Sequence, residues 1–288
     1  MTIYIDGEWC GRENAKVSVF DHGLLYGDGV FEGIRVYSRR IFRLDGHLKR
    51  LYQSAQALAL TIPLSVDEMA AAVREAVGRN KCEDGYIRLV VTRGAGELGI
   101  DPLSCPKASV IIIVTDVRVY ARELYARGIK VITSATRQVS HEAFDPRVKS
   151  LNYLKNILGK IDAQNAGAHE AILLNSAGYI AECTADNLFV VRDGALLTPS
   201  TRDGALGGIT RGAILELAAE AGIPAGEERL TRYDVYTADE CFVTGTGAEI
   251  MTVAEVDGRK IGSGERPVAR KLTEAFHALV RHEGQPVW

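Results

Sequence analysis

The sequence predicts a mixed α/β fold, and three observations support that class. Short runs rich in β-branched and aromatic residues alternate with segments of helical periodicity, and both kinds occur in both halves of the chain. A length of 288 residues with 47% hydrophobic content can bury the core of one large or two modest domains. A charged segment at residues 118–129 interrupts the alternation, and the sequence contains no low-complexity run and no repeat period. That segment is also compatible with an ordinary surface helix that ends at a glycine cap.

The first half, residues 1 to about 117, is expected to form strands that enclose two helices. A helix should run from about Asp45 to Ile62-Pro63, with Leu48 and Leu51 on its apolar face. Ser65 and Glu68 have capping-box spacing, so a second helix is expected at 66–79. Strands are expected at residues 2–5, 17–20, 30–37, 41–44, 86–92 and 109–115, with a turn at 38–40 and a glycine-rich loop at 93–99.

The second half repeats the mixture of strands and helices. Asp193-Gly194 and Asp257-Gly258 are typical of tight hairpin turns. Strands are expected at residues 130–135, 170–174, 188–191, 241–244 and 251–256, and helices at 151–166, 209–221 and 266–282.

Composition and charge exclude several classes of protein. The net charge of -3 and a pI near 6.1 provide no basic field for nucleic acid. The sequence has no secretory signal and no apolar run long enough to span a bilayer, so we expect a cytoplasmic protein. The five cysteines are odd in number and widely spaced, which argues against a disulfide framework and against a metal site. Most of them are expected to be small buried hydrophobic residues.

One lysine and one glutamate suggest a cofactor chemistry. Lys149 lies just before a helix whose apolar residues include Leu154, Leu158 and Ile161. A desolvated lysine amine can form a Schiff base with an aldehyde such as pyridoxal phosphate. Glu182, about thirty residues further on, could pair with the pyridinium nitrogen and keep it protonated. By spacing alone the pair is a weak signal, because most lysines and glutamates are solvated.

Two glycine-containing segments offer amide donors for a phosphate. Leu206-Gly207-Gly208-Ile209-Thr210 leads directly into a predicted helix, whose positive dipole end would meet an anion. Thr244-Gly245-Thr246-Gly247 follows a predicted strand and permits a tight turn with converging amides. Either segment alone is also compatible with an ordinary turn between two elements.

Four stretches of this chain resemble the branched-chain amino acid aminotransferases, a family of fold-type IV pyridoxal-phosphate enzymes. The resemblance extends over nearly the whole chain, from Tyr4-Ile5-Asp6-Gly7 to the last predicted helix, and the motifs keep the order of the family. The stretches are Lys149-Ser150-Leu151-Asn152-Tyr153-Leu154, Gly178-Tyr179-Ile180-Ala181-Glu182, Gly208-Ile209-Thr210-Arg211 and Thr244-Gly245-Thr246-Gly247-Ala248-Glu249.

The resemblance implies two α/β domains with the active site between them. Residues 1–117 would form a small domain on the substrate side, 118–129 the linker, and 130–288 a large domain that binds pyridoxal phosphate. Lys149 would be the catalytic residue and would carry the cofactor as a Schiff base. The cofactor-binding residues implied are Arg50, Lys149, Tyr153, Glu182, Leu206, Gly208, Ile209, Thr210 and Thr246.

The substrate side is implied by residues of the first half together with the second glycine segment. Because side chains alternate along a strand, Tyr86 and Arg88 point to the same face and can reach one carboxylate together. An arginine on an otherwise apolar strand needs a partner, and an ordinary salt bridge is the alternative. The substrate-binding residues implied are Tyr26, Phe31, Tyr86, Arg88, Thr246 and Gly247.

The activity implied is ping-pong transamination from branched-chain L-amino acids, namely Leu, Ile and Val, to 2-oxoglutarate. Lys149 would move the α-proton as both base and acid. The resemblance also implies a homodimer at least, with Tyr26 reaching the partner subunit's site, and neither nucleic acid nor a membrane as partner.

The sequence departs from the family at a few positions near the expected site. Cys183 and Ala185 stand where relatives usually have glycine, so they are expected to narrow or reshape the pocket near Glu182. Gly247 stands where many relatives have alanine, so it is expected to enlarge the end of the pocket that binds the carboxylate. Residues 140–146 also differ from the family's usual segment before the lysine. A D-amino-acid aminotransferase, an amine transaminase and an aminodeoxychorismate lyase would share Lys149 and Glu182, and a catalytically silent phosphate-ligand-binding module is the alternative from another class.

Overall fold

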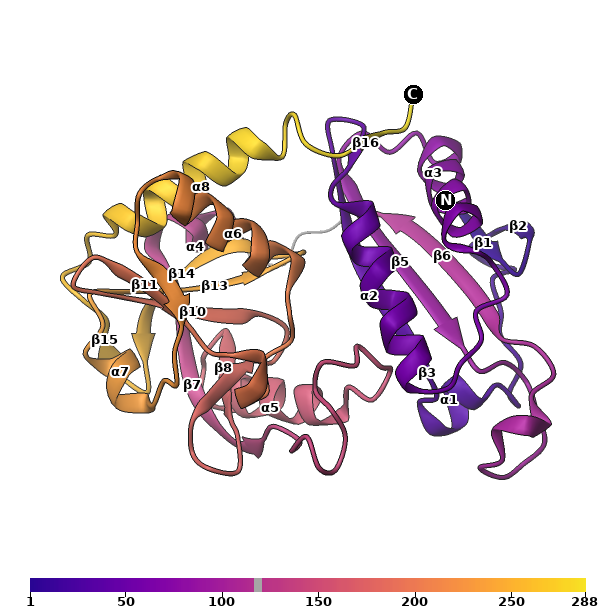
Figure 1. The fold of residues 1–288 in the computed structure, drawn as a ribbon, viewed down its shortest axis with the longest axis horizontal. Coiled ribbons are helices and arrows are strands. Elements are labelled where there is room, and N and C mark those ends of the chain that lie inside the picture. The colour runs from indigo at the N-terminus through magenta and orange to yellow at the C-terminus, as the bar shows by residue number, and fades with distance from the viewer. Residues whose placement is uncertain (117–120) are drawn as a thin grey trace. The chain divides into compact units, whose positions relative to one another are not determined.

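The computed structural model describes all of the 288 residues except 117–120 (Figure 1). The chain divides into two compact units. Unit 1 comprises Met1–Val117, Val148–Asn152 and Val280–Trp288, and unit 2 comprises Arg118–Arg147 and Tyr153–Leu279. Of the predicted linker at 118–129, residues 118–120 lie outside the described residues, whereas Arg122–Arg127 forms helix α4 and Ile129 begins a strand of unit 2.

Unit 1 is built on an antiparallel sheet of seven strands in the order β16-β4-β3-β5-β6-β1-β2. The longest partners are β3 and β5, which pair over eight consecutive positions from Gly29↔Thr92 to Val36↔Gly85. The strands are β1 (Thr2–Ile5), β2 (Glu8–Gly11), β3 (Gly29–Tyr37), β4 (Arg40–Ile41), β5 (Gly85–Thr92), β6 (Ser109–Thr115) and β16 (Gln285–Pro286).

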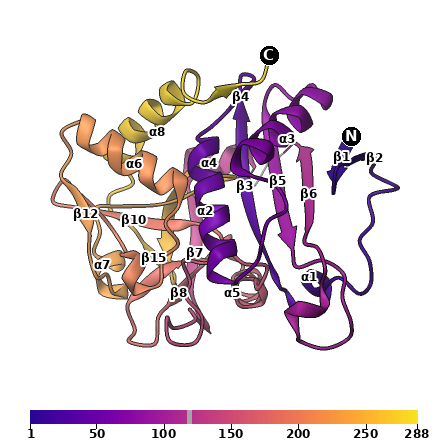
Figure 2. The same ribbon diagram turned by 45° about the vertical axis from the view of Figure 1, so that its right-hand side comes forward.

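Two helices, α2 (Leu44–Ala57) and α3 (Val66–Arg79), cover one face of this sheet (Figures 1 and 2). Alternate residues of β5, such as Ile87 and Leu89, are fully buried and share one hydrophobic core with Leu48 and Val73 of the helices. Tyr86 and Arg88 therefore lie on the other face, which these helices leave uncovered. A short helix, α1 (His22–Tyr26), precedes β3.

Unit 2 contains a nine-stranded sheet in the order β12-β11-β10-β13-β14-β7-β8-β9, with β15 paired to β14. Its strands are β7 (Ile129–Arg137), β8 (Glu170–Leu174), β9 (Ile180–Cys183), β10 (Asn187–Arg192), β11 (Ala195–Thr198), β12 (Ala225–Glu227), β13 (Glu240–Gly245), β14 (Glu249–Val256) and β15 (Arg259–Lys260). Its further helices are α5 (Leu154–Asn165), α6 (Ile209–Glu220), α7 (Arg232–Tyr236) and α8 (Pro267–Leu279). Among the described residues, no helix is long and apolar enough to cross a membrane.

Several local predictions are confirmed. Ser65 Oγ accepts the Glu68 amide at 3.3 Å while the Glu68 carboxylate accepts the Ser65 amide at 2.7 Å, so the capping box forms and α3 has the predicted bounds. Asp193 and Asp257 have φ near 50° and are followed by glycines with φ of 77° and 75°, which is the left-handed geometry of tight hairpin turns.

Three predicted boundaries in unit 1 are wrong. Residues 17–20 form no strand, because Val19 and Phe20 are exposed and no described strand pairs with them. The strand expected at 41–44 is only Arg40–Ile41, since Arg43 adopts a φ of 48° and α2 begins at Leu44. Helix α2 ends at Ala57 rather than at Ile62-Pro63, because Ala59 has a φ of 50° and leaves the helical path.

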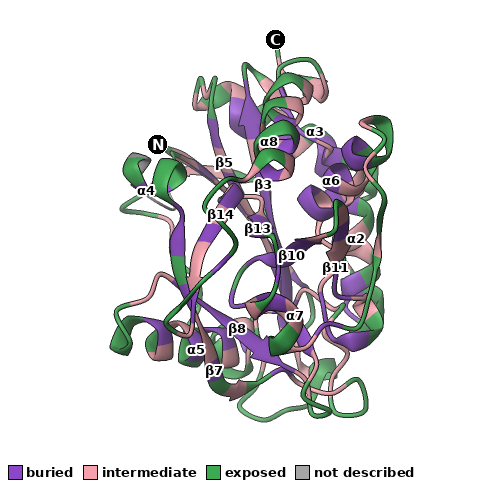
Figure 3. Ribbon diagram, turned by 90° about the vertical axis from the view of Figure 1, so that its left-hand side faces the viewer, coloured by how far each residue is buried: buried purple, intermediate pink, exposed green. Residues whose placement is uncertain are grey.

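Helix α5 also differs from its prediction. It begins at Leu154 instead of residue 151, and its apolar residues Leu154 and Leu158 are 68% and 45% exposed. The side of α5 that packs on the sheet carries the small or polar residues Asn156, Gly159 and Ala163. Figure 3 shows this contrast, with β8 buried along its length and α5 exposed on its outer side.

Two segments of the second half, residues 148–152 and the C-terminal segment 280–288, belong to unit 1. The two units are therefore not separated by one division of the chain near residue 118. Residues 148–152 belong to unit 1 because the Phe31 amide donates to the Lys149 carbonyl at 3.1 Å. The C-terminal segment does so because β16 pairs with β4 and Glu283 forms an ion pair with Arg43 at 2.8 Å.

Candidate active site

The backbone around Lys149 extends the edge of β3 in unit 1. The Lys149 carbonyl accepts the Phe31 amide at 3.1 Å, and the Leu151 amide donates to the Gly29 carbonyl at 2.9 Å. The Lys149 amide in turn donates to Ser54 Oγ of α2 at 3.1 Å. The main chain of Lys149 is therefore hydrogen-bonded to both β3 and α2. None of these hydrogen bonds involves its side chain.

The side chain of Lys149 lies over an aromatic ring that it shares with Arg88. Lys149 Nζ is 4.7 Å from the centroid of Phe31, and the Arg88 guanidinium carbon is also 4.7 Å from it. Arg88 lies 5.4 Å from the Tyr86 ring as well. The structure thus brings together four predicted residues, Lys149, Phe31, Tyr86 and Arg88, on or beside the face of the sheet away from α2 and α3.

Gly33 gives Tyr86 its position, a role that sequence reasoning missed. A Cβ at residue 33 would lie 2.1 Å from the Tyr86 phenol oxygen, so the ring occupies the space above a glycine. Burial raises the pKa of Tyr86 although Arg88 and Lys149 act to lower it, so the phenol stays protonated at neutral pH. Tyr86 can therefore donate a hydrogen bond toward the same space that Arg88 faces.

Arg50 forms part of a buried cluster on the α2 side of β3. Its Nε and Nη2 atoms each donate to the Glu32 carboxylate at 2.7 Å, and His47 Nδ1 lies 2.8 Å from the same group. Burial alone would raise the pKa of Glu32, but the charge and hydrogen bonds of Arg50, with those of His47, hold it at about 2. Burial lowers the pKa of His47, so the ionised pair at neutral pH is Glu32 with Arg50.

Tyr26 lies apart from the other predicted substrate residues. It ends α1, is 40% exposed, packs edge-on against His22 and accepts the Gly99 amide on its phenol oxygen at 2.9 Å. Within the described part of the chain these are its contacts, so Tyr26 is presented on the surface of unit 1 together with the 97–104 loop.

In unit 2, Gln138 and Leu206 both donate hydrogen bonds to Glu182. It lies on β9, where one carboxylate oxygen accepts Gln138 Nε2 at 2.8 Å and the other accepts the Leu206 amide at 2.9 Å. Leu206, predicted to contact the cofactor, therefore also orients the glutamate through its main chain. Gln138 was not singled out in the sequence, because it lies in a segment with no recognisable motif.

The first glycine segment forms the beginning of α6. Gly208 is the N-cap and the first turn carries no acidic residue. Within the described part of the chain no side chain caps this helix, so the amides of Ile209 and Thr210 face no side-chain cap. A Cβ at residue 208 would lie 2.1 Å from Asn187 Oδ1, and Asn187 Nδ2 donates to the Leu206 carbonyl at 2.8 Å. The positive end of a twelve-residue helix in this state fits an anion such as a phosphate.

The second glycine segment forms the turn between β13 and β14. Thr246 and Gly247 occupy the turn itself, and a Cβ on the preceding Gly245 would lie 2.0 Å from Asp186 Oδ1. Asp186 and Asn187 are consecutive, so one short segment after Glu182 supports both glycine-containing segments. The sequence alone gave neither residue a role.

Two further positions qualify the sequence expectations. Tyr153 is the N-cap residue of α5 in unit 2 and is half-buried. Cys183 is fully buried in the hydrophobic core of unit 2, so the expectation that its side chain reshapes a pocket is wrong. Burial also raises the pKa of the Cys183 thiol well above its usual value, which makes it an inert core residue.

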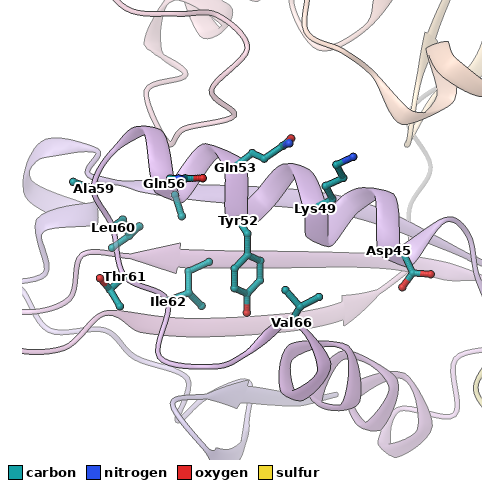
Figure 4. A pocket seen from close by; sticks show the side chains of 11 residues that line it. Asp45, Lys49, Tyr52, Gln53, Gln56, Ala59, Leu60, Thr61, Ile62 and Val66 are labelled. Atoms are coloured by element: carbon teal, nitrogen blue, oxygen red, sulfur yellow. The ribbon is translucent and has the colours of Figure 1, made fainter.

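A groove of about 750 Å³ lies elsewhere on unit 1, along α2 and the segment that follows it (Figure 4). Tyr52 projects from α2 into it beside Ile62 and Val66. None of its lining residues is a predicted cofactor or substrate residue, and Lys49 at its rim points away from the strands. The groove is therefore not part of the candidate active site.

Comparisons with known proteins identify the family of this chain. A family model described as amino-transferase class IV matches residues 29–256. A relative from Pseudomonas aeruginosa, named branched-chain-amino-acid aminotransferase, is 42% identical over 96% of this chain and 92% of its own length. One of the same name from Escherichia coli K12 is 37% identical over 99% and 95%.

Solved structures show the same likeness. The crystal structure of the Escherichia coli branched-chain amino acid aminotransferase superposes with a TM-score of 0.95 at 37% identity, over 100% of this chain and 97% of that one. The branched-chain aminotransferase of Thermoproteus uzoniensis, solved with norvaline, gives a TM-score of 0.93 at 35% identity over 100% and 99%. A further branched-chain amino acid aminotransferase, solved with pyridoxamine 5'-phosphate, gives a TM-score of 0.93 at 38% identity over 97% and 94%.

The chain belongs to the class IV aminotransferases. Within that class, it is a member of the branched-chain amino acid aminotransferase family. Enzymes of this class use pyridoxal phosphate, which is the group that a lysine, a carboxylate and a phosphate-binding helix end are suited to hold.

Proposed function

We propose that this chain moves the amino group of branched-chain L-amino acids to 2-oxoglutarate in two half-reactions of a ping-pong cycle. The observation that carries the proposal is the grouping of Lys149, Phe31, Tyr86 and Arg88, which offers an amine, an apolar wall and carboxylate donors together. Related solved structures support the substrate classes, since one contains norvaline and another an adduct of the cofactor with L-glutamate.

The cofactor would be held by the residues that the resemblance to the family implies. Lys149 would bind its aldehyde carbon, and Glu182 would pair with the ring nitrogen through the carboxylate that Gln138 and Leu206 orient. The phosphate would be bound by Arg50, Gly208, Ile209, Thr210 and Thr246, and Tyr153 would contact the ring oxygen. Bound pyridoxal phosphate supplies an electron sink for the charge that develops at the α-carbon of the amino acid.

The protein's own groups would position the substrate and move one proton. Arg88, with the amides of Thr246 and Gly247, would bind the α-carboxylate, while Tyr86 donates to it from the same strand face. Lys149 Nζ would take the proton from the α-carbon and then return it as an acid. Phe31 would form the apolar wall beside the aliphatic side chain, and Tyr26 would extend that wall in a second copy of the chain.

The direct test is a substrate panel combined with visible absorption spectra. With pyridoxal phosphate bound, excess L-leucine should change the visible spectrum, and 2-oxoglutarate should restore it. In steady state, L-Leu, L-Ile and L-Val should have kcat/KM values well above those of D-Ala and a chiral amine. A preference for D-Ala or the amine would overturn the proposed specificity, and a protein that acquires no visible absorbance would overturn the proposed activity.

We also propose that the enzyme is at least a homodimer. Val19, Leu24, Leu98, Ile100 and Leu103 are 61% to 90% exposed, and α1 and the 97–104 loop that carry most of them are joined by the Tyr26–Gly99 hydrogen bond. A second copy of the chain would remove this apolar surface from water.

Sedimentation equilibrium should therefore give at least twice the mass of one chain. Replacing Ile100 and Leu103 together with serine should weaken association, whereas Tyr233→Ser, at an isolated exposed position on α7, should not. A wild-type protein with the mass of a single chain at micromolar concentration would contradict the dimer.

A further inference from the structure

Gln138 is a buried amide whose three polar contacts are all defined. The side chain is 3% exposed, and its Nε2 donates both to Glu182 Oε1 and to the Gly204 carbonyl, at 2.8 Å each. Its Oε1 accepts the Val139 amide at 3.0 Å. The opposite orientation of the amide would point an oxygen at two acceptors, so chemistry fixes which atom faces Glu182.

The sheet of unit 2 explains why this side chain reaches Glu182. Strand β7 ends at Arg137, opposite Leu174 of β8, and the Gln138 amide donates to the Leu174 carbonyl at 2.9 Å. Glu182 lies on β9, on the other side of β8, opposite Leu173. The Gln138 side chain therefore spans the central strand of three and connects the two strands that flank it.

Gly204 leaves room for this connection, and its surroundings are fixed independently. It has a φ of 107°, and a Cβ there would lie 2.9 Å from Gln138 Cγ. The preceding Asp203 is anchored by Arg229 Nε at 3.1 Å and by Asn175 Nδ2 on its carbonyl at 3.0 Å. The turn that carries the Gly204 carbonyl is thus stabilised by hydrogen bonds that do not involve Gln138.

We propose that Gln138 is a positioning residue, which keeps the Glu182 carboxylate ionised and directed at the cofactor ring. This inference rests on the proposed function, because it assumes that Glu182 pairs with the ring nitrogen. Hydrogen bonds from Gln138 and Leu206 reach both oxygens, which favours the charged form of the carboxylate.

The neutrality of the amide is what makes it suited to this position. An arginine or lysine in its place would form an ion pair with Glu182 and oppose the binding of a second cation, the protonated ring nitrogen. Gln138 donates a hydrogen bond without adding a positive charge beside Glu182.

The test uses the holoenzyme and three variants. Gln138→Met keeps the length of the side chain but removes the donor, so kcat should fall about tenfold, the loss expected for one hydrogen bond to a charged group. The acid limb of its pH profile and the pH-dependent visible absorbance should both move to higher pH, because an unsupported carboxylate takes up a proton more readily. Gln138→Arg should also lower kcat, although it restores a donor.

Gln164→Met, at an exposed position on α5, is the matched control and should leave every value unchanged.

The dissociation constant of pyridoxal phosphate, measured by equilibrium dialysis, separates the alternatives. It should change by less than about threefold in Gln138→Met, because the phosphate-binding segments are intact. Unchanged kcat and an unchanged absorbance titration would overturn the proposal, and so would a loss of cofactor binding without any shift in that titration. If wild type bound the cofactor but did not convert leucine, the proposed function would fail while the titration still tested Gln138.

Discussion

Lys149→Ala should abolish transamination, with kcat reduced by about 10⁴-fold or more. The substitution removes both the amine that holds the cofactor and the base that moves the α-proton, and loss of a general base alone costs about 10² to 10⁴-fold. The main-chain hydrogen bonds of residue 149 to Phe31 and Ser54 do not depend on the side chain, so the edge of β3 should remain intact. Single-turnover assays with L-leucine and visible spectra would measure the loss.

Lys107→Ala provides the matched control. Lys107 is exposed in unit 1, and its side chain makes no hydrogen bond or ion pair in the described part of the structure. Its loss should change kcat by less than about twofold. Equal turnover by the Lys149→Ala variant and wild type would remove Lys149 from the mechanism, whatever the spectra show.

The sequence indicated residues that lie close together in unit 1, but not the course of the backbone that brings them there. The resemblance implied Lys149 as the cofactor lysine and Phe31, Tyr86 and Arg88 as substrate residues. In the structure, alternation along β3 and β5 puts these three side chains on one face of the sheet, and Lys149 Nζ lies over the Phe31 ring. The capping box of α3 was also predicted correctly, since its two hydrogen bonds are local in sequence.

What the sequence could not show depends on contacts between distant residues. The sequence around residues 148–152 does not indicate that this segment pairs with the edge of β3. The pairing depends on β3, which lies more than a hundred positions earlier in the chain. The exposed apolar stripe of α5 has a similar origin, since helical periodicity identifies an apolar stripe but not what covers it.

The supporting residues were missed for the same reason. Gly33 leaves space for the Tyr86 ring, whereas Gln138 and Asn187 donate hydrogen bonds to residues of other segments. A glutamine or glycine in such a position has no distinctive spacing. These residues could be found only once the strands were paired.

Glu182→Gln should lower kcat by on the order of 100-fold, while cofactor binding changes far less. Removing a preorganised electrostatic partner of developing charge typically costs a factor of about 10² to 10³. The neutral amide would not keep the ring nitrogen protonated, so the electron sink is weakened. The Leu206 amide and the first turn of α6 should be little disturbed, because glutamine has the same size and can still accept one hydrogen bond from the main chain.

Comparing the change in kcat with the change in cofactor affinity distinguishes a role of Glu182 in catalysis from one in binding. kcat for L-leucine and the dissociation constant of pyridoxal phosphate would be determined for Glu182→Gln and for Glu220→Gln, which removes an exposed carboxylate at the end of α6 in the same unit. The control should match wild type in both values. If Glu182→Gln weakened cofactor binding as much as it lowered kcat, Glu182 would be a binding residue, and the electrostatic role that gives Gln138 its purpose would fall with it.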